Sequence, residues 1–265
     1  MFQPTNPNQD PQGLLVAQQV ELLVPIKTND LNELYVFYKP GIIEDSKRGL
    51  GSKGYVSSFG TGLPAHEGSS LRDYFIQEGL DRKYSPDEMI AFGRLDKDTS
   101  GLLVLAKRNR YPKFMDQLLL NPLWKKQSIL TSKLYRARVK GLVSKAELSK
   151  IKTLKIPSKN ETQVDVTVES IRLISVEQPE RENASSVVEI EIHEGKHHQV
   201  KKMFYVLKHP VLKGGLHRVR FAMLSLGKME VGEIRKLLPK EKKQLVKFYN
   251  EWLASEQKRF NIRSS

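Results

Sequence analysis

A carboxylate stands between an arginine and a glycine-closed turn in residues 93–106, GRLDKDTSGLLVLA. Asp96 lies two positions after Arg94, and Gly101 permits the backbone conformation that a sharp turn exit requires. Residues 102–106 are continuously apolar and predict a buried strand that anchors the turn. Catalytic groups are over-represented on loops that a rigid element positions. Asp96 is therefore a candidate for a reactive carboxylate.

A structural role is the alternative for the acids of this turn. An aspartate in a turn of a basic protein is commonly solvated or caps the local backbone. Asp98 fits the capping role better than Asp96, because Asx and Ser/Thr side chains commonly satisfy turns, and Thr99 and Ser100 supply hydroxyls that can bond the local backbone. From these residues alone, both roles stay open for Asp96.

The basic segment of residues 196–220 holds seven Lys or Arg, four His and no carboxylate. Its apolar residues recur at helical spacing and predict a helix over 197–208, with Val200, Met203, Phe204 and Leu207 on the core face. The opposite face then carries the basic side chains His197, Lys201 and Lys208. Such a face is suited to nucleic-acid phosphates, with a merely solvated helix face as the alternative.

Residues 133–141, KLYRARVKG, predict a strand that alternates basic with other residues. With a period of two, Lys133 and Tyr135 share one face with Ala137 and Val139, and the remaining side chains share the other. Tyr135 is a candidate to stack on an extruded base, with basic neighbours such as Lys133 holding phosphate. A core tyrosine beside a solvated basic edge is an equal alternative.

Other kinds of chemistry find little support. The chain has no cysteine, which excludes disulfides, thiolate nucleophiles and cysteine-ligated zinc. Neither a Gly-x-Ser-x-Gly nucleophile motif nor a phosphate-binding glycine loop ending in Gly-Lys-Ser/Thr occurs. His193 belongs to a strand pattern and His197 to the following helix, so they do not form a helical metal-binding pair. We expect neither a metal nor a cofactor.

The overall charge indicates a polyanionic partner. Lys and Arg total 44 against 30 Asp and Glu among 265 residues, which gives a net charge of +14. Nucleic acid is the leading candidate, with solubility or an anionic membrane surface as alternatives. No apolar run of 18 residues occurs, and Lys27 is the one basic residue among the first 30, so we expect a soluble cytoplasmic protein.

The remaining pattern predicts an α+β fold with a mostly antiparallel mixed sheet and flanking helices. Strands are expected at 34–38, 134–141, 164–168, 188–192 and 215–227, and helices at 70–79, from the Ser144 capping box, and around 245–253. The two strands at 164–168 and 188–192 alternate and predict half-buried strands. Residues 44–69 are glycine-rich and predict a long loop. We expect a mostly disordered extension over 1–32, a domain over 33–238, and a basic amphipathic helix and tail over 239–265.

Three of these segments together closely resemble one enzyme family. The order Gly-Arg-Leu-Asp-x-x-Thr-Ser-Gly-Leu-Leu, Lys-x-Tyr-x-Ala-x-Val-x-Gly and Glu-Gly-Lys-His-His-Gln-Val-Lys-Lys-Met-Phe is similar to that of the RsuA-type RNA pseudouridine synthases, the ribosomal-RNA branch. Lys39-Pro40 after the first predicted strand also resembles the opening motif of that family. The resemblance covers about residues 34–238 and implies a catalytic domain with a central cleft.

The resemblance implies a role for each matching residue. Asp96 would be the essential aspartate, acting either as a nucleophile at C1′ or as a base toward the sugar. Arg94 would contact RNA at the vacated stack, and Tyr135 would stack on the flipped uracil. Lys201 would pair with Asp96 and help to keep it ionised.

The resemblance leaves the substrate open. Many relatives carry an N-terminal RNA-binding domain of the S4 type, whereas about 33 mostly polar residues precede the first predicted strand here. Lys196 stands where many relatives have arginine, which keeps the charge but loses the planar fork. We expect a monomeric, cofactor-free synthase acting on ribosomal RNA or a pre-ribosomal particle. The alternatives are a tRNA-specific synthase and a non-catalytic RNA-binding or ribosome-assembly protein with this fold.

Overall fold

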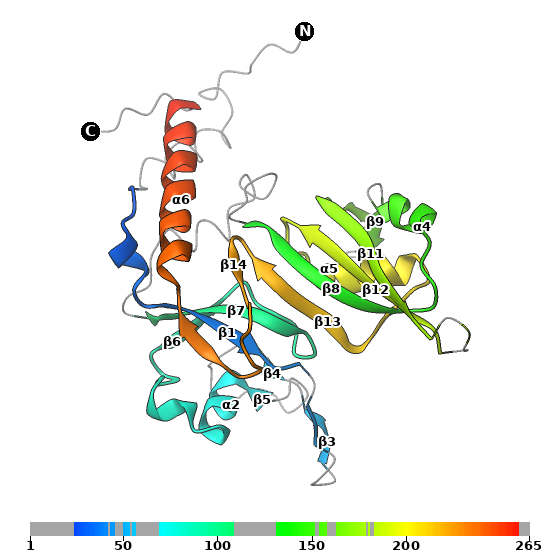
Figure 1. Ribbon diagram of the computed structural model, residues 1–265, viewed down its shortest axis with the longest axis horizontal. Helices are drawn as coiled ribbons and strands as arrows, with labels where there is room; N and C mark the ends of the chain where they lie inside the picture. The colour runs from blue at the N-terminus through cyan, green and yellow to red at the C-terminus, as the bar shows by residue number, and fades with distance from the viewer. Residues whose placement is uncertain are drawn as a thin grey trace. The chain divides into compact units, whose positions relative to one another are not determined.

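A computed structural model describes residues 24–41, 43–45, 50–53, 55–56, 69–108, 131–151, 154–157, 163–178, 180 and 183–259 (Figure 1). The chain divides into two compact units. One unit is Glu33–Lys236, and the other combines Met1–Asn32 with Leu237–Ser265. No helix in the described residues is long and apolar enough to cross a membrane.

A nine-stranded sheet organises the larger unit. Its main path runs β11-β12-β8-β13-β7-β1-β15, with β14 paired to β13 and β6 paired to β7. Every pair is antiparallel except β13 with β7, which is parallel, so the predicted mixed sheet is confirmed. The strands are β1 (Leu34–Lys39), β6 (Met89–Phe92), β7 (Ser100–Lys107), β8 (Lys133–Lys140), β11 (Ser170–Glu177), β12 (Ser185–Ile192), β13 (Val211–Phe221), β14 (Leu224–Ser225) and β15 (Ile234–Lys236).

The larger unit also contains three short two-stranded sheets. They are β2 (Ile43–Asp45) with β3 (Leu50–Lys53), β4 (Tyr55–Val56) with β5 (Ser69–Ser70), and β9 (Lys155–Pro157) with β10 (Gln163–Asp165). The expectation of a strand-free loop over 44–69 is therefore wrong for its described residues. The predicted strand at 164–168 is also shorter than expected, because β10 ends at Asp165.

The helices of the larger unit begin where the sequence places capping residues. Ser70 caps α2 (Leu71–Gln77) and Ser144 caps α4 (Lys145–Lys150), each with a reciprocal acid three residues later. A one-turn 3-10 helix, η4, spans Leu80–Arg82. The third α-helix, α5 (Gln199–Val206), is shorter than the predicted 197–208. His198 begins it with φ 53°, outside the helical region.

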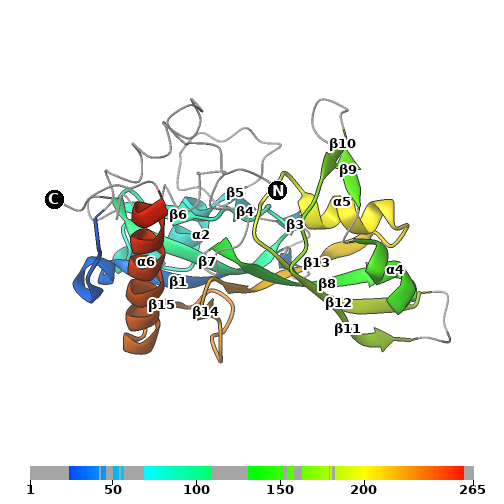
Figure 2. The ribbon, with the colours of Figure 1, turned by 90° about the horizontal axis from the view of Figure 1, so that it is seen from above.

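One face of the sheet and two helices share the hydrophobic core. Leu71 and Phe75 of α2 and Met203 and Phe204 of α5 belong to the same buried cluster as Ala137 of β8. Figure 2 shows α2 and α5 on the same side of the sheet. This packing brings α5 against the strand that carries Tyr135.

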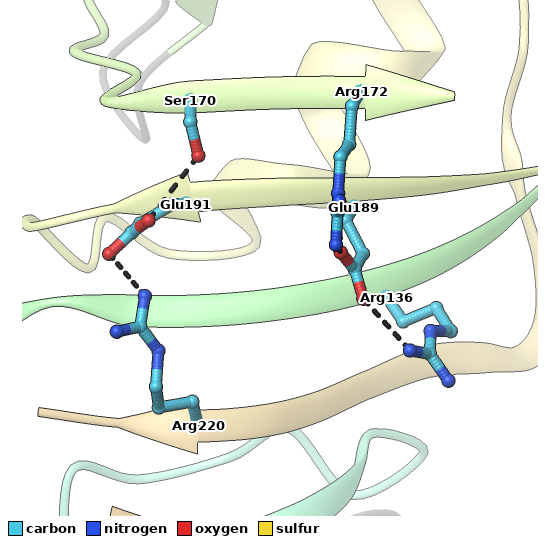
Figure 3. A network of polar contacts seen from close by, with 6 residues as sticks. All are labelled: Arg136, Ser170, Arg172, Glu189, Glu191 and Arg220. Atoms are coloured by element: carbon cyan, nitrogen blue, oxygen red, sulfur yellow. Dashed lines mark hydrogen bonds and ion pairs between the residues drawn. The ribbon is translucent and has the colours of Figure 1, made fainter. Parts of the chain in front are cut away.

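The opposite, outer face of the sheet carries a network of charged side chains (Figure 3). Glu189 binds Arg136 at 2.8 Å and Arg172 at 2.5 Å, and Glu191 binds Arg220 at 2.6 Å. The prediction of a solvated polar face for 188–192 is wrong at Glu189, which is buried. Flanking arginines from the two adjacent strands cover it.

The smaller unit pairs the two ends of the chain. Its described elements are the 3-10 helix η2 (Thr28–Leu31) and helix α6 (Pro239–Arg259). Asn250 accepts a bond from Ile26 N at 2.9 Å and donates one to Ile26 O at 3.0 Å. The described end of the predicted disordered extension is thus ordered. The sequence also predicts a short helix or strand over 14–24 and a helix around 114–119, but residues 14–23 and 114–119 lie outside the described residues.

Candidate active site

The turn between β6 and β7 presents Asp96. Thr99 N donates to Asp96 O at 3.1 Å, which closes the turn. Leu95, the residue before Asp96, is buried in the core cluster and anchors this end of the turn. The Asp96 side chain stays 29% exposed. The turn therefore holds this carboxylate on an anchored backbone while leaving it accessible.

A buried ammonium lies beneath the turn. Lys39 Nζ donates to the carbonyl oxygens of Pro40 at 3.0 Å, Asp96 at 3.3 Å, Lys97 at 3.1 Å and Thr99 at 2.9 Å. Burial lowers the pKa of Lys39 to about 7, against the opposing effect of the Asp98 and Asp96 carboxylates. Lys39 thus organises the backbone that carries Asp96. The Lys39-Pro40 motif is visible in the sequence, but this function of Lys39 is not.

The parallel pairing of β7 with β13 connects the turn to a second buried cation. Arg218 donates from Nε to Leu102 O and from Nη2 to Gly93 O, both at 2.7 Å. A Cβ added at Gly101 would lie 2.3 Å from Arg218 O, so this close approach requires glycine. Burial lowers the pKa of Arg218, while its hydrogen bond and charge interaction with Tyr135 oppose this. Arg218 thus links the turn to the predicted stacking residue, a role that the sequence did not reveal.

Lys201 binds both acids of the turn. Its Nζ lies 3.0 Å from Asp96 Oδ2 and 2.5 Å from Asp98 Oδ1. The predicted contact between Lys201 and Asp96 is therefore present. The sequence predicts that Asp98 caps the turn backbone, whereas its carboxylate accepts a bond from the Lys201 ammonium. One cation from α5 is shared between two carboxylates, a long-range pairing that turn chemistry alone does not indicate.

The two histidines before α5 differ from their predicted placement. His197 and Lys208 flank the helix instead of sharing its face with Lys201, because α5 ends at Val206 and Lys208 has φ 64°. The ring of His197 stacks on His198 at a centroid distance of 3.8 Å. His198 Nε2 lies 3.6 Å from Asp96 Oδ1. The imidazole near the acid is therefore that of His198, which the sequence did not single out.

The other predicted contacts occupy different environments. Arg94 is exposed beside the turn. Tyr135 lies on the core face of β8 and is 8% exposed. Lys133 shares that face, and its Nζ donates to Thr131 O at 2.9 Å and His193 O at 2.8 Å. Because this ammonium is buried against backbone carbonyls, the structure favours a structural role for Lys133 over the predicted phosphate contact.

A further histidine, His217, contacts Ser100, the first residue of β7, on the outer face of the sheet. His217 Nδ1 lies 2.8 Å from Ser100 Oγ, and its ring is 5.3 Å from that of Tyr38. Burial and the charge of Arg136 lower the pKa of His217 to about 4, which keeps this imidazole neutral at neutral pH. No group of three His, Cys, Asp or Glu suited to a metal occurs in the described parts of the chain.

The chain is similar to several known proteins. A family model described as RNA pseudouridylate synthase matches residues 34–205. Ribosomal large subunit pseudouridine synthase B of Bacillus subtilis (strain 168) is 31% identical over 163 residues, which cover 62% of this chain and 59% of that protein. An uncharacterized RNA pseudouridine synthase of Aquifex aeolicus (strain VF5) is 29% identical over 162 residues, or 61% of this chain and 57% of the relative.

A solved structure shows the same fold. The crystal structure of a pseudouridylate synthase superposes with a TM-score of 0.54 at 21% identity. The superposition covers 80% of this chain and 73% of that one. The matched part of this chain spans less than two thirds of the length of the two curated relatives.

Proposed function

The chain belongs to the RNA pseudouridylate synthase family, and from this premise we propose that it isomerises a specific uridine in ribosomal RNA to pseudouridine. The observation that carries the proposal is the Asp96 carboxylate, which is partly exposed and lies 3.0 Å from Lys201. The ribosomal substrate rests on the similarity to the large-subunit synthase of Bacillus subtilis.

The charges around Asp96 support a reactive carboxylate. The Lys201 ammonium lies 3.0 Å from Asp96 Oδ2, so it lies beside the negative charge that a nucleophile at C1′ or a base toward the sugar carries. Lys39 holds three carbonyls of the turn, so the carboxylate is positioned before substrate arrives. The glycosidic bond of a stacked uridine is inaccessible, so the base must leave the helix before Asp96 reaches it.

Two further residues have proposed roles in holding the flipped nucleotide. The ring of Tyr135 stacks on the uracil, and exposed Arg94 contacts RNA where the base has left. Tyr135→Phe retains the ring and should lose little activity, whereas Tyr135→Ala should lose much more. Equal activities of the two variants, measured on the same RNA, would contradict stacking.

The function is tested by mapping pseudouridines in ribosomal RNA transcripts after incubation with the purified protein. The unaltered chain should form pseudouridine at a defined uridine. Asp96→Asn should abolish the product while retaining the circular dichroism spectrum and RNA affinity. Asp87→Asn is the matched control, because Asp87 is an exposed partner of Arg72 outside the site. Full activity of Asp96→Asn would disprove the proposed role of the acid.

A further inference from the structure

His198 lies at the candidate site without a role in the proposed function so far. Its Nε2 is 3.6 Å from Asp96 Oδ1, and its side chain is 43% exposed. We propose that His198 is the general base that removes the proton from C5 of the rearranged uracil. This inference rests on the proposed synthase function and adds a catalytic residue to it.

The conversion of uridine to pseudouridine requires such a base. In uridine N1 is bonded to C1′ and C5 carries a hydrogen, whereas in pseudouridine C5 is bonded to C1′ and N1 carries a hydrogen. The N1–C1′ bond breaks first and leaves its electron pair on N1. When the C5=C6 pair then forms the new bond to C1′, the N1 pair forms N1=C6, and C5 still holds its proton. The base takes that proton, the C5–H pair restores C5=C6, and the N1=C6 pair returns to N1. N1 then takes up a proton from the imidazolium or water, so atoms and charge balance.

The cations near Asp96 are poorly suited to accept this proton. Lys201 Nζ is already shared between two carboxylates, at 3.0 Å from Asp96 and 2.5 Å from Asp98. Lys39 is fully buried, and its Nζ faces four backbone carbonyls. Its ammonium therefore has no path to a bound nucleotide.

The other titratable groups around the acid are also committed. Asp98 lies 2.5 Å from Lys201, so its carboxylate is already paired. Tyr135 is 8% exposed, and its proposed use is stacking. Among the described residues near Asp96, His198 combines exposure with a side chain that commonly serves as a general base near neutral pH.

The geometry suits a proton acceptor that works beside Asp96. The 3.6 Å between His198 Nε2 and Asp96 Oδ1 is longer than a hydrogen bond, so Nε2 is not hydrogen-bonded to Asp96. The carboxylate is still close enough to stabilise the imidazolium that forms. A sugar carbon that Asp96 contacts is joined to C5 by a single bond of about 1.5 Å, which brings the C5 proton toward the same imidazole.

The local backbone keeps the imidazole in place. His198 has φ 53°, and its ring stacks on His197 with an interplanar angle of 19°. Asparagine tolerates this left-handed conformation better than most residues. His198→Asn therefore removes the imidazole with little strain on the start of α5.

The test compares turnover of RNA that carries either uridine or 5-deuterouridine at the modified position. His198→Asn should lower kcat about 100-fold, within the usual range for loss of a general base. It should also show a larger primary isotope effect than the unaltered enzyme, because C5 deprotonation becomes rate-limiting. Added imidazole should restore part of kcat. His209→Asn, the same change at a histidine that pairs with Glu147 away from Asp96, should leave the isotope effect at its original value.

Several outcomes would overturn the inference while leaving the synthase function intact. One is a folded His198→Asn variant with unchanged kcat and isotope effect. Another is a slower variant whose isotope effect does not rise, which indicates a structural role. If circular dichroism shows that His198→Asn misfolds, His198→Gln is judged by the same isotope effect. Failure of the proposed function is a separate result, in which the unaltered chain forms no pseudouridine or Asp96→Asn keeps full activity.

Discussion

Two clusters of opposite charges in this protein are built in different ways. On the outer face, Glu189 lies between Arg136 and Arg172, which are its direct neighbours on adjacent strands. At the candidate site, Lys201 and Asp98 are 103 positions apart in the chain and come from a helix and a turn. The first cluster follows from strand register, whereas the second requires the whole larger unit to be folded.

The difference also concerns how fully each acid is enclosed. Burial alone would raise the pKa of Glu189, but the hydrogen bonds and charges of Arg136 and Arg172 outweigh it and hold the pKa below its ordinary value. Glu189 is 6% exposed, whereas Asp96 is 29% exposed and shares its cation with Asp98. The acid of the outer face is therefore enclosed, whereas the carboxylate of the candidate site remains accessible.

The prediction with the largest expected effect concerns Lys201, whose charge should matter for activity and little for stability. Lys201→Gln should lower kcat/KM about 100-fold, because it removes electrostatic support from Asp96. The free energy of unfolding should change little, since both carboxylates remain partly hydrated. Lys201→Arg keeps the charge and should recover most of the activity. Equal losses for the two variants would show that the shape of lysine, and not its charge, is needed.

The second prediction concerns Glu189, whose substitution should reduce stability without reducing catalytic activity. Glu189→Gln should lower the free energy of unfolding by about 2 kcal/mol, below the usual value for a fully buried pair because both arginines are half-exposed or more. Turnover per folded molecule should be unchanged. Urea unfolding and single-turnover assays measure the two quantities. A large fall in kcat would mean that the outer face is coupled to the site.

Local patterns predicted the elements that position the site. The period-two alternation in 133–140 corresponds to the observed burial of β8, the Ser144 capping box starts a helix as expected, and the helix predicted from residue 70 begins at Leu71. The family resemblance then supplied Asp96 and its contact with Lys201. These features depend on spacing or on matched motifs, both of which are visible in one sequence.

Features that depend on long-range packing could not be predicted from the sequence. Lys39 ends an apolar strand, and nothing local shows that a turn 57 to 60 positions later encloses its ammonium. The start of α5 was placed too early because hydrophobic periodicity does not report the left-handed φ of His198. Glu189 appeared solvated because alternation gives its face but not the arginines that register sets beside it.

The pH dependence of stability tests the buried cation beneath the turn. The pKa of Lys39 is about 7 in the fold, against an ordinary value of 10.5. Between these values the unfolded chain binds a proton that the folded chain has lost, so the free energy of unfolding should rise with pH. The slope is at most about 1.4 kcal/mol per pH unit. Lys39→Met should lack this rise in urea titrations between pH 7 and 9, and a parallel dependence would disprove the assignment.

The smallest effect tests whether enclosure, and not pairing alone, makes the Glu189 contacts strong. Arg138 pairs with Glu177 at 2.7 Å on the same outer face, but the two side chains are 52% and 39% exposed. Arg138→Gln should therefore cost less than about 1 kcal/mol, and the cost should disappear at 1 M salt, where screening acts within about 3 Å. The cost of Glu189→Gln should persist there, because its carboxylate is buried. A double-mutant cycle with Glu177→Gln isolates the exposed pair, and salt-resistant coupling would show that register alone makes these pairs strong.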